Sequence, residues 1–351
     1  MKVLFIVEAG YQAGLGHLMR CRSLLLEMER CGIAADLWVR GEASALDGLK
    51  WPDTMDVRVL GDDVPLGGLE KEISAHLERK LYNWIVVDGY GFSGAALYER
   101  LTARGARLLM LDDFADRTLK TDVLLNQNTD RTDLYTGNRV QADRLLLGPR
   151  YALVSPEYRE AHWDAKQHED LKRVLISFGG VDRHGCTQKV LVHLDGYEQT
   201  LDVDVVIGPF YRFDREIRAY CGRHRLAIHQ KLTSLADLMR RADVMVSAAG
   251  TTVWQACCVG VPLVAIQTQD NQRELYRTLE REGAAVCAQA AVSVDLPPGG
   301  EDRFLAMFRR AADPAARRDR SAKARQLVNG NGASRVVDAL VSATISQEVK
   351  T

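Results

Sequence analysis

Residues 1–32 read MKVLFIVEAGYQAGLGHLMRCRSLLLEMERCG, in which a short apolar run passes through a glycine-rich segment into a long amphipathic stretch. The run VLFIV at 3–7 has the length and composition of a buried strand, and the stretch that follows has helical spacing. Gly14, Gly16 and His17 lie between the two elements. Such a strand-to-helix turn commonly binds a phosphate or holds a catalytic group, so the role of the histidine is the first question.

Short apolar runs and amphipathic stretches alternate along the rest of the chain. In the first half we expect strands at 35–39, 57–60, 84–88, 107–113, 122–127 and 144–148, and helices at 66–80 and 95–101. In the second half we expect strands at 173–180, 203–208, 243–250 and 262–267, helices from residue 252 and at 274–283, and two final helices around 329–332. Buried strands that alternate with helices predict parallel sheets covered on both faces.

A polar, charge-rich segment at 156–170 separates two halves with the same pattern. We therefore expect an α/β protein with two doubly wound, Rossmann-like domains facing a central cleft, since such domains bind ligands at the carboxyl ends of their strands. The expected boundaries are an N-terminal domain at 1–155, a linker at 156–170, a C-terminal domain at 171–325 and a C-terminal helix at 326–351.

The bulk composition argues against several classes of partner. The chain has 351 residues and a formal net charge of -1, which does not predict binding to nucleic acid or to anionic membranes. No apolar stretch reaches the roughly 18 residues of a membrane span. The 7 cysteines, without CxxC spacing, predict a reduced, cytoplasmic protein with no zinc site. We expect no metal, no cofactor, and a monomer or weak homodimer.

Six residues in the first half are candidates for chemistry, three of them weaker than the others. His17 can act as an acid or base near neutral pH, or it can be a surface histidine that caps a helix. Asp88, which ends the strand WIVVD, and Tyr90 flank Gly89, so both could face a ligand unless Asp88 is a turn or cap residue. Asp112, Asp113 and Asn126 also follow strands and are weaker candidates. A dinucleotide fingerprint is absent, because GLGH lacks the third glycine.

Glycine turns in the second half predict a phosphate site. In SAAGTTVWQACCVGVP, at 247–262, Gly250, Thr251 and Thr252 can offer N–H and hydroxyl groups to a diphosphate, or a threonine can simply cap the helix. SFGGVDRHG, at 177–185, is a further strand-to-glycine turn. In TQDNQ, Asn271 and Gln272 can hydrogen-bond a sugar or cap the next helix.

Taken in order, several segments resemble the UDP-sugar hydrolases of pseudaminic acid synthesis over about residues 1–340. These segments are GLGHLMRCRSL, VVDGYG, LDDFADR with DVLLNQN, LLGPRYALVSPEY, SFGGVD, and AAGTTVWQACCVGVP with DNQ. The resemblance implies the two-domain GT-B fold of glycosyltransferases. It also implies hydrolysis of UDP-2,4-diacetamido-2,4,6-trideoxy-β-L-altrose to UDP and the free sugar, with inversion at the anomeric carbon and without a metal.

The resemblance also implies roles for individual residues. His17 would sit beside the anomeric carbon, where it positions or deprotonates water or assists the leaving group. The implied substrate-binding residues are Gly14, Gly16, Arg20, Asp88, Tyr90, Asn271 and Gln272, and the implied nucleotide-binding residues are Gly179, Gly180, Ala249, Gly250, Thr251, Thr252 and Gln255. Two positions depart from the family, since Gln255 replaces a glutamate and Gly89 replaces a histidine, and both put the exact substrate in question.

Two other functions fit the same residues. A glycosyltransferase of this fold would move the sugar to an acceptor instead of water, and the absence of an apolar or basic block argues mildly against a lipid acceptor. A sugar-nucleotide-binding protein without activity would need neither His17 nor Tyr90 and Asn271.

Overall fold

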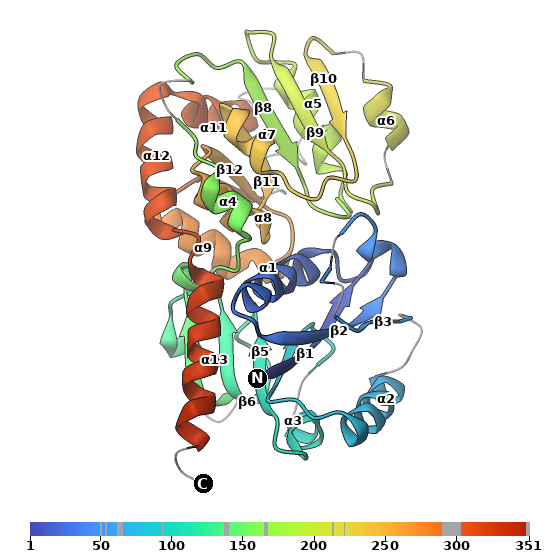
Figure 1. The fold of residues 1–351 in the computed structure, drawn as a ribbon. Coiled ribbons are helices and arrows are strands. Elements are labelled where there is room, and N and C mark those ends of the chain that lie inside the picture. Colours follow the sequence, from blue (N-terminus) through green and yellow to red (C-terminus); the bar gives the residue numbers. More distant parts are fainter. Residues whose placement is uncertain are drawn as a thin grey trace. The chain divides into compact units, whose positions relative to one another are not determined.

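The chain folds into two compact units, each built on its own parallel sheet (Figure 1). The computed structural model describes residues 1–348 apart from 50, 53–54, 62–65, 93–94, 137–139, 165–167, 213, 221 and 290–302. Unit 1 comprises Met1–Ser155 with Gly330–Thr351, and unit 2 comprises Pro156–Asn329. The domain boundary expected after residue 155 coincides with Ser155, where the first segment of unit 1 ends. The segment expected to be a linker begins unit 2.

Unit 1 contains a parallel sheet in the order β3-β2-β1-β4-β5-β6-β7. Its strands are β1 (Lys2–Ala9), β2 (Ala34–Gly41), β3 (Val57–Leu60), β4 (Trp84–Asp88), β5 (Arg107–Leu111), β6 (Leu119–Asn126) and β7 (Val140–Leu147). Its helices are α1 (Gly16–Arg30), α2 (Leu66–Arg79), α3 (Ala95–Thr102) and α13 (Gly332–Glu348), with the 3-10 turns η1 (Ala43–Leu46), η2 (Thr132–Tyr135) and η3 (Pro149–Tyr151). The strand order reverses between β1 and β4.

The central strands of unit 1 are mostly apolar because helices cover both faces of the sheet. Every residue of β4 is buried. Leu4 and Ile6 of β1 share a core with Ile73 of α2 and Leu97 of α3, and α1 lies on the opposite side of the sheet in Figure 1. The last helix, α13, packs beside α1, and its Thr344 accepts a hydrogen bond of 2.9 Å from the indole of Trp84.

Unit 2 repeats the architecture with the order β10-β9-β8-β11-β12-β13. Its strands are β8 (Arg173–Ser177), β9 (Asp202–Val206), β10 (Arg225–His229), β11 (Val244–Ala248), β12 (Leu263–Gln267) and β13 (Val286–Gln289). Its helices are α4 (Pro156–Glu160), α5 (Cys186–Leu194), α6 (Asp214–Arg218), α7 (Ala236–Arg241), α8 (Thr252–Val259), α9 (Arg273–Glu282), α11 (Arg303–Ala312) and α12 (Pro314–Leu327), with η5 (Asp270–Gln272). Here the order reverses between β8 and β11.

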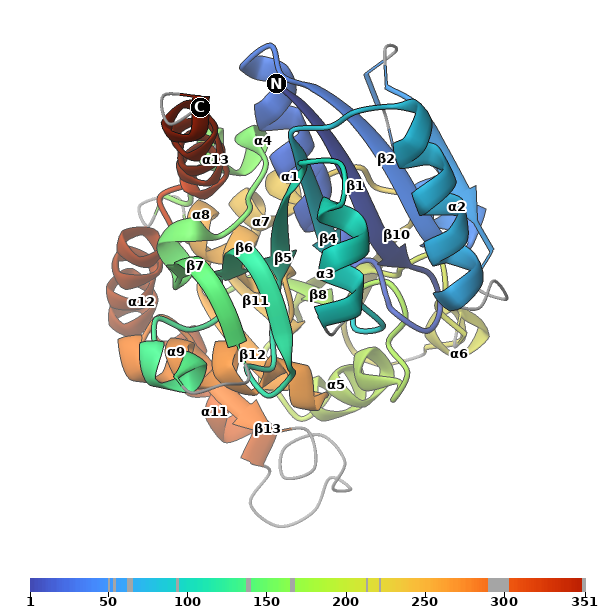
Figure 2. The same cartoon turned by 90° about the horizontal axis from the view of Figure 1, so that it is seen from below.

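The expected fold class is confirmed, because both units are doubly wound parallel α/β structures. The two final helices expected around residues 329–332 are α12 and α13, and they belong to different units. Figure 2 shows α13 as the last helix of the chain. Within the described residues, no helix has both the length and the apolarity to cross a membrane.

The end of β2 provides a test of the register between β1 and β2. Gly41 has φ 144°, and a Cβ there would lie 1.5 Å from the carbonyl oxygen of Ala9. Gly48 also has positive φ, 77°, but no atom lies within 4 Å of its Cβ position. We expect Gly41→Ala to lower the free energy of unfolding by at least about 3 kcal/mol, and Gly48→Ala by only about 1–2 kcal/mol. Urea unfolding measures both; equal losses would contradict this register.

Candidate active site

The turn between β1 and α1 is closed by its own backbone. Gly10 and Gly14 exchange two hydrogen bonds, 3.1 Å for Gly10 N to Gly14 O and 2.8 Å for Gly14 N to Gly10 O. This bridge closes a tight loop over the three residues between the two glycines. As a result α1 begins at Gly16, close to the end of β1. His17 therefore lies in the first turn of α1, at the carboxyl edge of the sheet.

His17 is held by a carboxylate from the neighbouring strand. Its Nδ1 lies 2.6 Å from Oδ1 of Asp88, the last residue of β4, and both side chains are buried. The alternative of a surface histidine that caps a helix is therefore wrong. β1 and β4 are the strands between which the order reverses, and this is where ligands bind in doubly wound sheets.

The carboxylate determines which ring nitrogen of His17 carries a proton. A separation of 2.6 Å between Nδ1 and an ionised carboxylate oxygen favours a proton on Nδ1, which also lies 3.0 Å from Nη2 of Arg20. In the neutral ring Nε2 is then the unprotonated nitrogen, and it has no hydrogen bond to any residue that the structure describes. An imidazole in this tautomer, oriented by an aspartate, is the arrangement of a general base.

Arg20 binds the two buried aspartates at this edge. Its Nε and Nη2 each donate to Asp88 at 2.6 Å, and its Nη1 donates to Asp113 at 2.7 Å. Burial alone would raise the pKa of Asp88, but the charge of Arg20, and then that of His17, outweighs it and holds the pKa well below its usual range. Burial would likewise raise the pKa of Asp113, but the charge of Arg20 outweighs burial, so this pKa too is lowered.

Asp113 extends the cluster to β6 and to Tyr90. It accepts hydrogen bonds from Asn128 Nδ2 at 2.7 Å and from the Tyr90 hydroxyl at 2.9 Å. The ring of Tyr90 meets that of His17 edge-on, with centroids 4.6 Å apart. The polar residues after β4, β5 and β6 thus form one network with His17. Asn128 was not among the expected site residues, although the run NQN after an apolar strand was visible in the sequence.

Two weaker candidates have structural partners instead. Asp112 accepts a hydrogen bond of 2.8 Å from Arg117 and one of 2.9 Å from the Tyr135 hydroxyl. Asn126 donates to the Tyr135 hydroxyl at 2.6 Å and accepts from the backbone of Asn128 at 2.8 Å. Both side chains brace the loops that follow β5 and β6, and neither bonds to His17.

The packing around residue 89 explains why this position is a glycine. A Cβ at this position would lie 2.6 Å from Oε2 of Glu8. That oxygen accepts the backbone N–H groups of Tyr90 at 2.8 Å and Gly91 at 3.2 Å, while Oε1 pairs with Arg40 at 2.8 Å. Glu8 therefore occupies the place of a side chain at 89 and holds the loop that carries Tyr90.

The turn after β11 in unit 2 leaves backbone donors exposed to a ligand. Thr251 occupies the N-cap position of α8, as the capping alternative expected, but its side chain makes no capping hydrogen bond. The N–H groups of Thr251 and Thr252 bond to no residue that the structure describes. By contrast, Ala249 N donates to Ile266 O at 2.8 Å, which removes it as a backbone donor. The start of α8 can thus bind an anion.

Two amide side chains belong to the same edge of unit 2. The carbonyl oxygen of Gln272 accepts from Thr268 N at 2.7 Å, which leaves its Nε2 beside Gly250, 4.0 Å from the position of a Cβ there. Gln255, one turn into α8, is only 5% exposed and has no hydrogen bond to a described residue. Asn271 precedes Gln272 in η5. The structure thus places the side-chain amide of Gln272 next to Gly250.

The turn after β8 is built differently. Gly180 O accepts a hydrogen bond of 3.1 Å from Phe210 N, and a Cβ at Gly208 would lie 2.4 Å from Gly180 Cα. Asp182 accepts the N–H groups of Cys186 at 2.8 Å and Thr187 at 2.9 Å, so its carboxylate caps α5. Gly179 and Gly180 therefore precede a helix whose N-terminus already holds an anion.

Among the residues that the structure describes, no group of three or more His, Cys, Asp and Glu side chains could hold a metal ion.

No protein-family model matches the chain. Among curated proteins, the spore coat polysaccharide biosynthesis protein SpsG of Bacillus subtilis is 22% identical over 294 residues, which cover 82% of this chain and 83% of that protein. An uncharacterized protein of Methanocaldococcus jannaschii is 21% identical over 302 residues, 79% of this chain, and the match spans 57% of that protein's length.

Solved structures match along nearly the whole chain. MurG of Acinetobacter baumannii superposes with a TM-score of 0.67 at 14% identity, covering 97% of this chain and 100% of that one. The spinosyn forosaminyltransferase SpnP gives 0.62 at 12% identity, covering 97% and 99%. The glycosyltransferase VinC, in complex with dTDP, gives 0.60 at 14% identity, covering 99% and 100%. These similarities show the fold, and the expected GT-B architecture is confirmed.

Replacing Arg20 tests how much its ion pairs with Asp88 and Asp113 stabilise the fold. Because the pKa of Asp88 is lowered in the folded state, the pair stabilises the protein above the unfolded pKa of about 3.9, and this stabilisation is lost as pH falls through the folded value. We expect Arg20→Met to lower the free energy of unfolding by about 3–5 kcal/mol at pH 7. The loss should be clearly smaller near pH 4.5, because in the variant the two buried carboxyl groups, now without Arg20, can be protonated.

Urea unfolding of both proteins at the two pH values measures this difference. Arg104→Met, at an exposed position, is the matched control and should stay within about 0.5 kcal/mol of the unsubstituted protein. A loss for Arg20→Met that is the same at both pH values would contradict the charge argument.

Proposed function

We propose that this protein hydrolyses a UDP-linked amino sugar of the diacetamido-trideoxy-altrose type to UDP and the free sugar, with inversion at the anomeric carbon. The observation that carries the proposal is the buried His17–Asp88 pair at the reversal of the unit 1 sheet, with Nε2 left as acceptor. The resemblance in sequence supplies the substrate class, and the GT-B fold supports an enzyme that acts on sugar nucleotides.

In the proposed step His17 acts as the general base. Nε2 accepts a proton from water as the water oxygen bonds to the anomeric carbon. The bond from that carbon to the diphosphate oxygen breaks, and its electron pair leaves with UDP. Asp88, already bonded to Nδ1–H, stabilises the imidazolium that forms. A single displacement from the face opposite the leaving group inverts the anomeric configuration.

Unit 2 is the proposed nucleotide-binding side. The backbone donors of Thr251 and Thr252 and the positive end of α8 would bind the diphosphate and stabilise it as it leaves, so the proposed step needs no metal. Gln255 would bind the ribose, and Asn271 and Gln272 the sugar. Arg20 contributes by holding Asp88, since its Nε, Nη1 and Nη2 all donate to aspartates.

A transferase that passes the sugar to a hydroxyl group is the second candidate. It is favoured by the fold, which the chain shares with MurG and with the transferases SpnP and VinC. The same base would deprotonate the acceptor hydroxyl instead of water. Incubation of the protein with a panel of UDP- and CMP-sugars, in buffer alone and with saccharide acceptors, distinguishes the two candidates by whether free sugar or a glycoside accompanies the free nucleotide.

His17→Ala should lower turnover by about 100-fold or more while UDP affinity changes little, because the general base is lost and unit 2 is intact. Steady-state kinetics and calorimetry measure the two quantities. His229→Ala is the matched control, since His229 also pairs with an aspartate, at 2.6 Å from Asp204, but on the edge strand β10. Turnover of the His17 variant at the unsubstituted rate would refute the assignment.

Gln255→Glu should tighten UDP binding several-fold and leave turnover nearly unchanged. A carboxylate accepts hydrogen bonds from two ribose hydroxyls more strongly than an amide, by about 1 kcal/mol. Calorimetry with UDP measures the change, and Gln188→Glu, an exposed position on α5, controls for added charge. Equal or weaker UDP affinity in the Gln255 variant would mean that this residue does not contact the ribose, or that UDP is not the nucleotide.

A further inference from the structure

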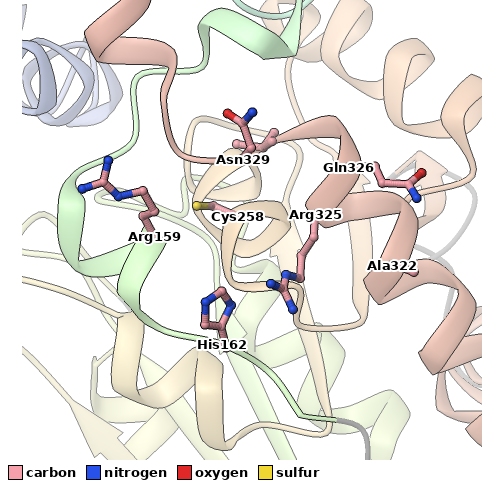
Figure 3. A pocket seen from close by; sticks show the side chains of 8 residues that line it. Arg159, His162, Cys258, Ala322, Arg325, Gln326 and Asn329 are labelled. Atoms are coloured by element: carbon pink, nitrogen blue, oxygen red, sulfur yellow. The ribbon is translucent and has the colours of Figure 1, made fainter.

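Arg117 lies in the segment between β5 and β6, and the proposed reaction step does not use it. Its side chain is only 14% exposed. Arg159 and Arg325, which line a hollow of unit 2 in Figure 3, are by contrast exposed arginines of the surface. Because burying a guanidinium costs free energy unless its donors are paired, the partners of Arg117 indicate what it does.

One edge of the Arg117 guanidinium is fixed by Asp112. Nε and Nη2 both donate to Oδ1 of this buried carboxylate, at 3.1 and 2.8 Å. Oδ2 of the same carboxylate accepts the backbone N–H of Ala115 at 2.8 Å, and Ala115 has φ 56°, in the left-handed region. The segment 112–117 therefore folds around Asp112, and this turn sets the position of Arg117.

The opposite edge of the guanidinium faces the loop after β4. Nη1 lies within hydrogen-bond distance of three carbonyl oxygens of that loop, those of Gly89 at 3.2 Å, Tyr90 at 3.4 Å and Phe92 at 3.5 Å. Two N–H groups of the same loop bind the carboxylate of Glu8. An anion thus holds the donors of the loop and a cation holds its acceptors, so the loop is fixed from both sides.

The segment after β5 also contacts the side chain that this loop carries. Cζ of Arg117 lies 5.8 Å from the centroid of the Tyr90 ring, and the ring of Phe114 meets that of Tyr90 edge-on with centroids 4.9 Å apart. A further neighbour of the Tyr90 ring is His17, at 4.6 Å between centroids. Both the backbone and the ring of Tyr90 therefore depend on the segment that Arg117 anchors.

We infer that Arg117 is a positioning residue, which holds Tyr90 and through Tyr90 the ring of His17. Asp88 binds Nδ1 of that ring, but one hydrogen bond leaves the plane of the imidazole free to tilt. The edge-on contact with Tyr90 limits the tilt and so directs Nε2. The catalytic consequence rests on the proposed function, whereas the positioning itself does not.

The test is NMR spectroscopy of the full chain with isotope-labelled histidine and without substrate. The chain has 8 histidines, and the signals that disappear in His17→Ala identify those of His17. Tyr90→Leu should move these signals, because an aromatic ring shifts the resonances of the groups packed against it. Arg117→Lys keeps a positive charge beside Asp112 but loses the planar fork. It should move the His17 signals toward their positions in Tyr90→Leu.

Arg30→Lys is the matched control. Arg30 also binds one carboxylate twice, that of Glu27 at 2.9 and 2.7 Å, but it lies at the exposed end of α1. This substitution should leave the His17 signals in place. Both lysine substitutions weaken an ion pair, so a loss of stability alone would not support the inference.

Steady-state kinetics with a UDP-sugar tests the catalytic consequence. Arg117→Lys should lower kcat about tenfold or more, because the base is less well oriented, and leave UDP affinity unchanged. Failure of the proposed function is recognised separately, since the unsubstituted protein would then release no UDP, and the NMR signals alone would decide the inference. Unmoved His17 signals in Arg117→Lys or Tyr90→Leu, an equal shift in Arg30→Lys, or an unchanged kcat in an active Arg117→Lys protein would each overturn it.

Discussion

One guanidinium holds two buried carboxylates at the edge of the unit 1 sheet. Asp88 ends β4 and Asp113 follows β5, so the sheet itself brings two negative charges together in an apolar setting. Each ionised carboxylate would be costly to bury alone, and the pair would repel. Arg20 from α1 donates to both, and its planar fork holds the ends of two strands at a set distance from the first turn of α1.

The chemistry of His17 depends on this ion pair. Oδ1 of Asp88 accepts from Arg20 and from His17, so the carboxylate that Arg20 keeps ionised is also the group that orients the imidazole. Asp113, bound to the same arginine, accepts from Tyr90, whose ring rests against His17. The orientation of the His17 ring and the packing of Tyr90 against it therefore both follow from the ion pairs of Arg20, which need not touch the substrate.

The sequence predicted most of the strands because their signals are local, but it did not predict β10 and β13 or the helices α5, α7 and α11. Apolar runs indicate the buried strands of the two sheets, and glycines indicate the strand ends. These signals identified His17, Asp88 and the turn at Gly250 as candidate site residues. Partners across the sheet were harder to foresee, because Asn128 reaches Asp113 only through the order of β5 and β6. The return of α13 to unit 1 was equally hidden, because an amphipathic pattern does not say which sheet it covers.

Two similar glycine turns in unit 2 differ in a way that only side-chain contacts reveal. After β8 the chain provides its own anion, since Asp182 accepts two N–H groups at the start of α5. After β11 no side chain does so, and the donors at Thr251 and Thr252 remain available. A helix N-terminus already bound by a carboxylate has little capacity for a phosphate, whereas an uncapped one favours it. Of the two turns, the start of α8 therefore fits the diphosphate of the proposed reaction better, while the turn after β8 is shaped by the close packing of Gly180 on Gly208.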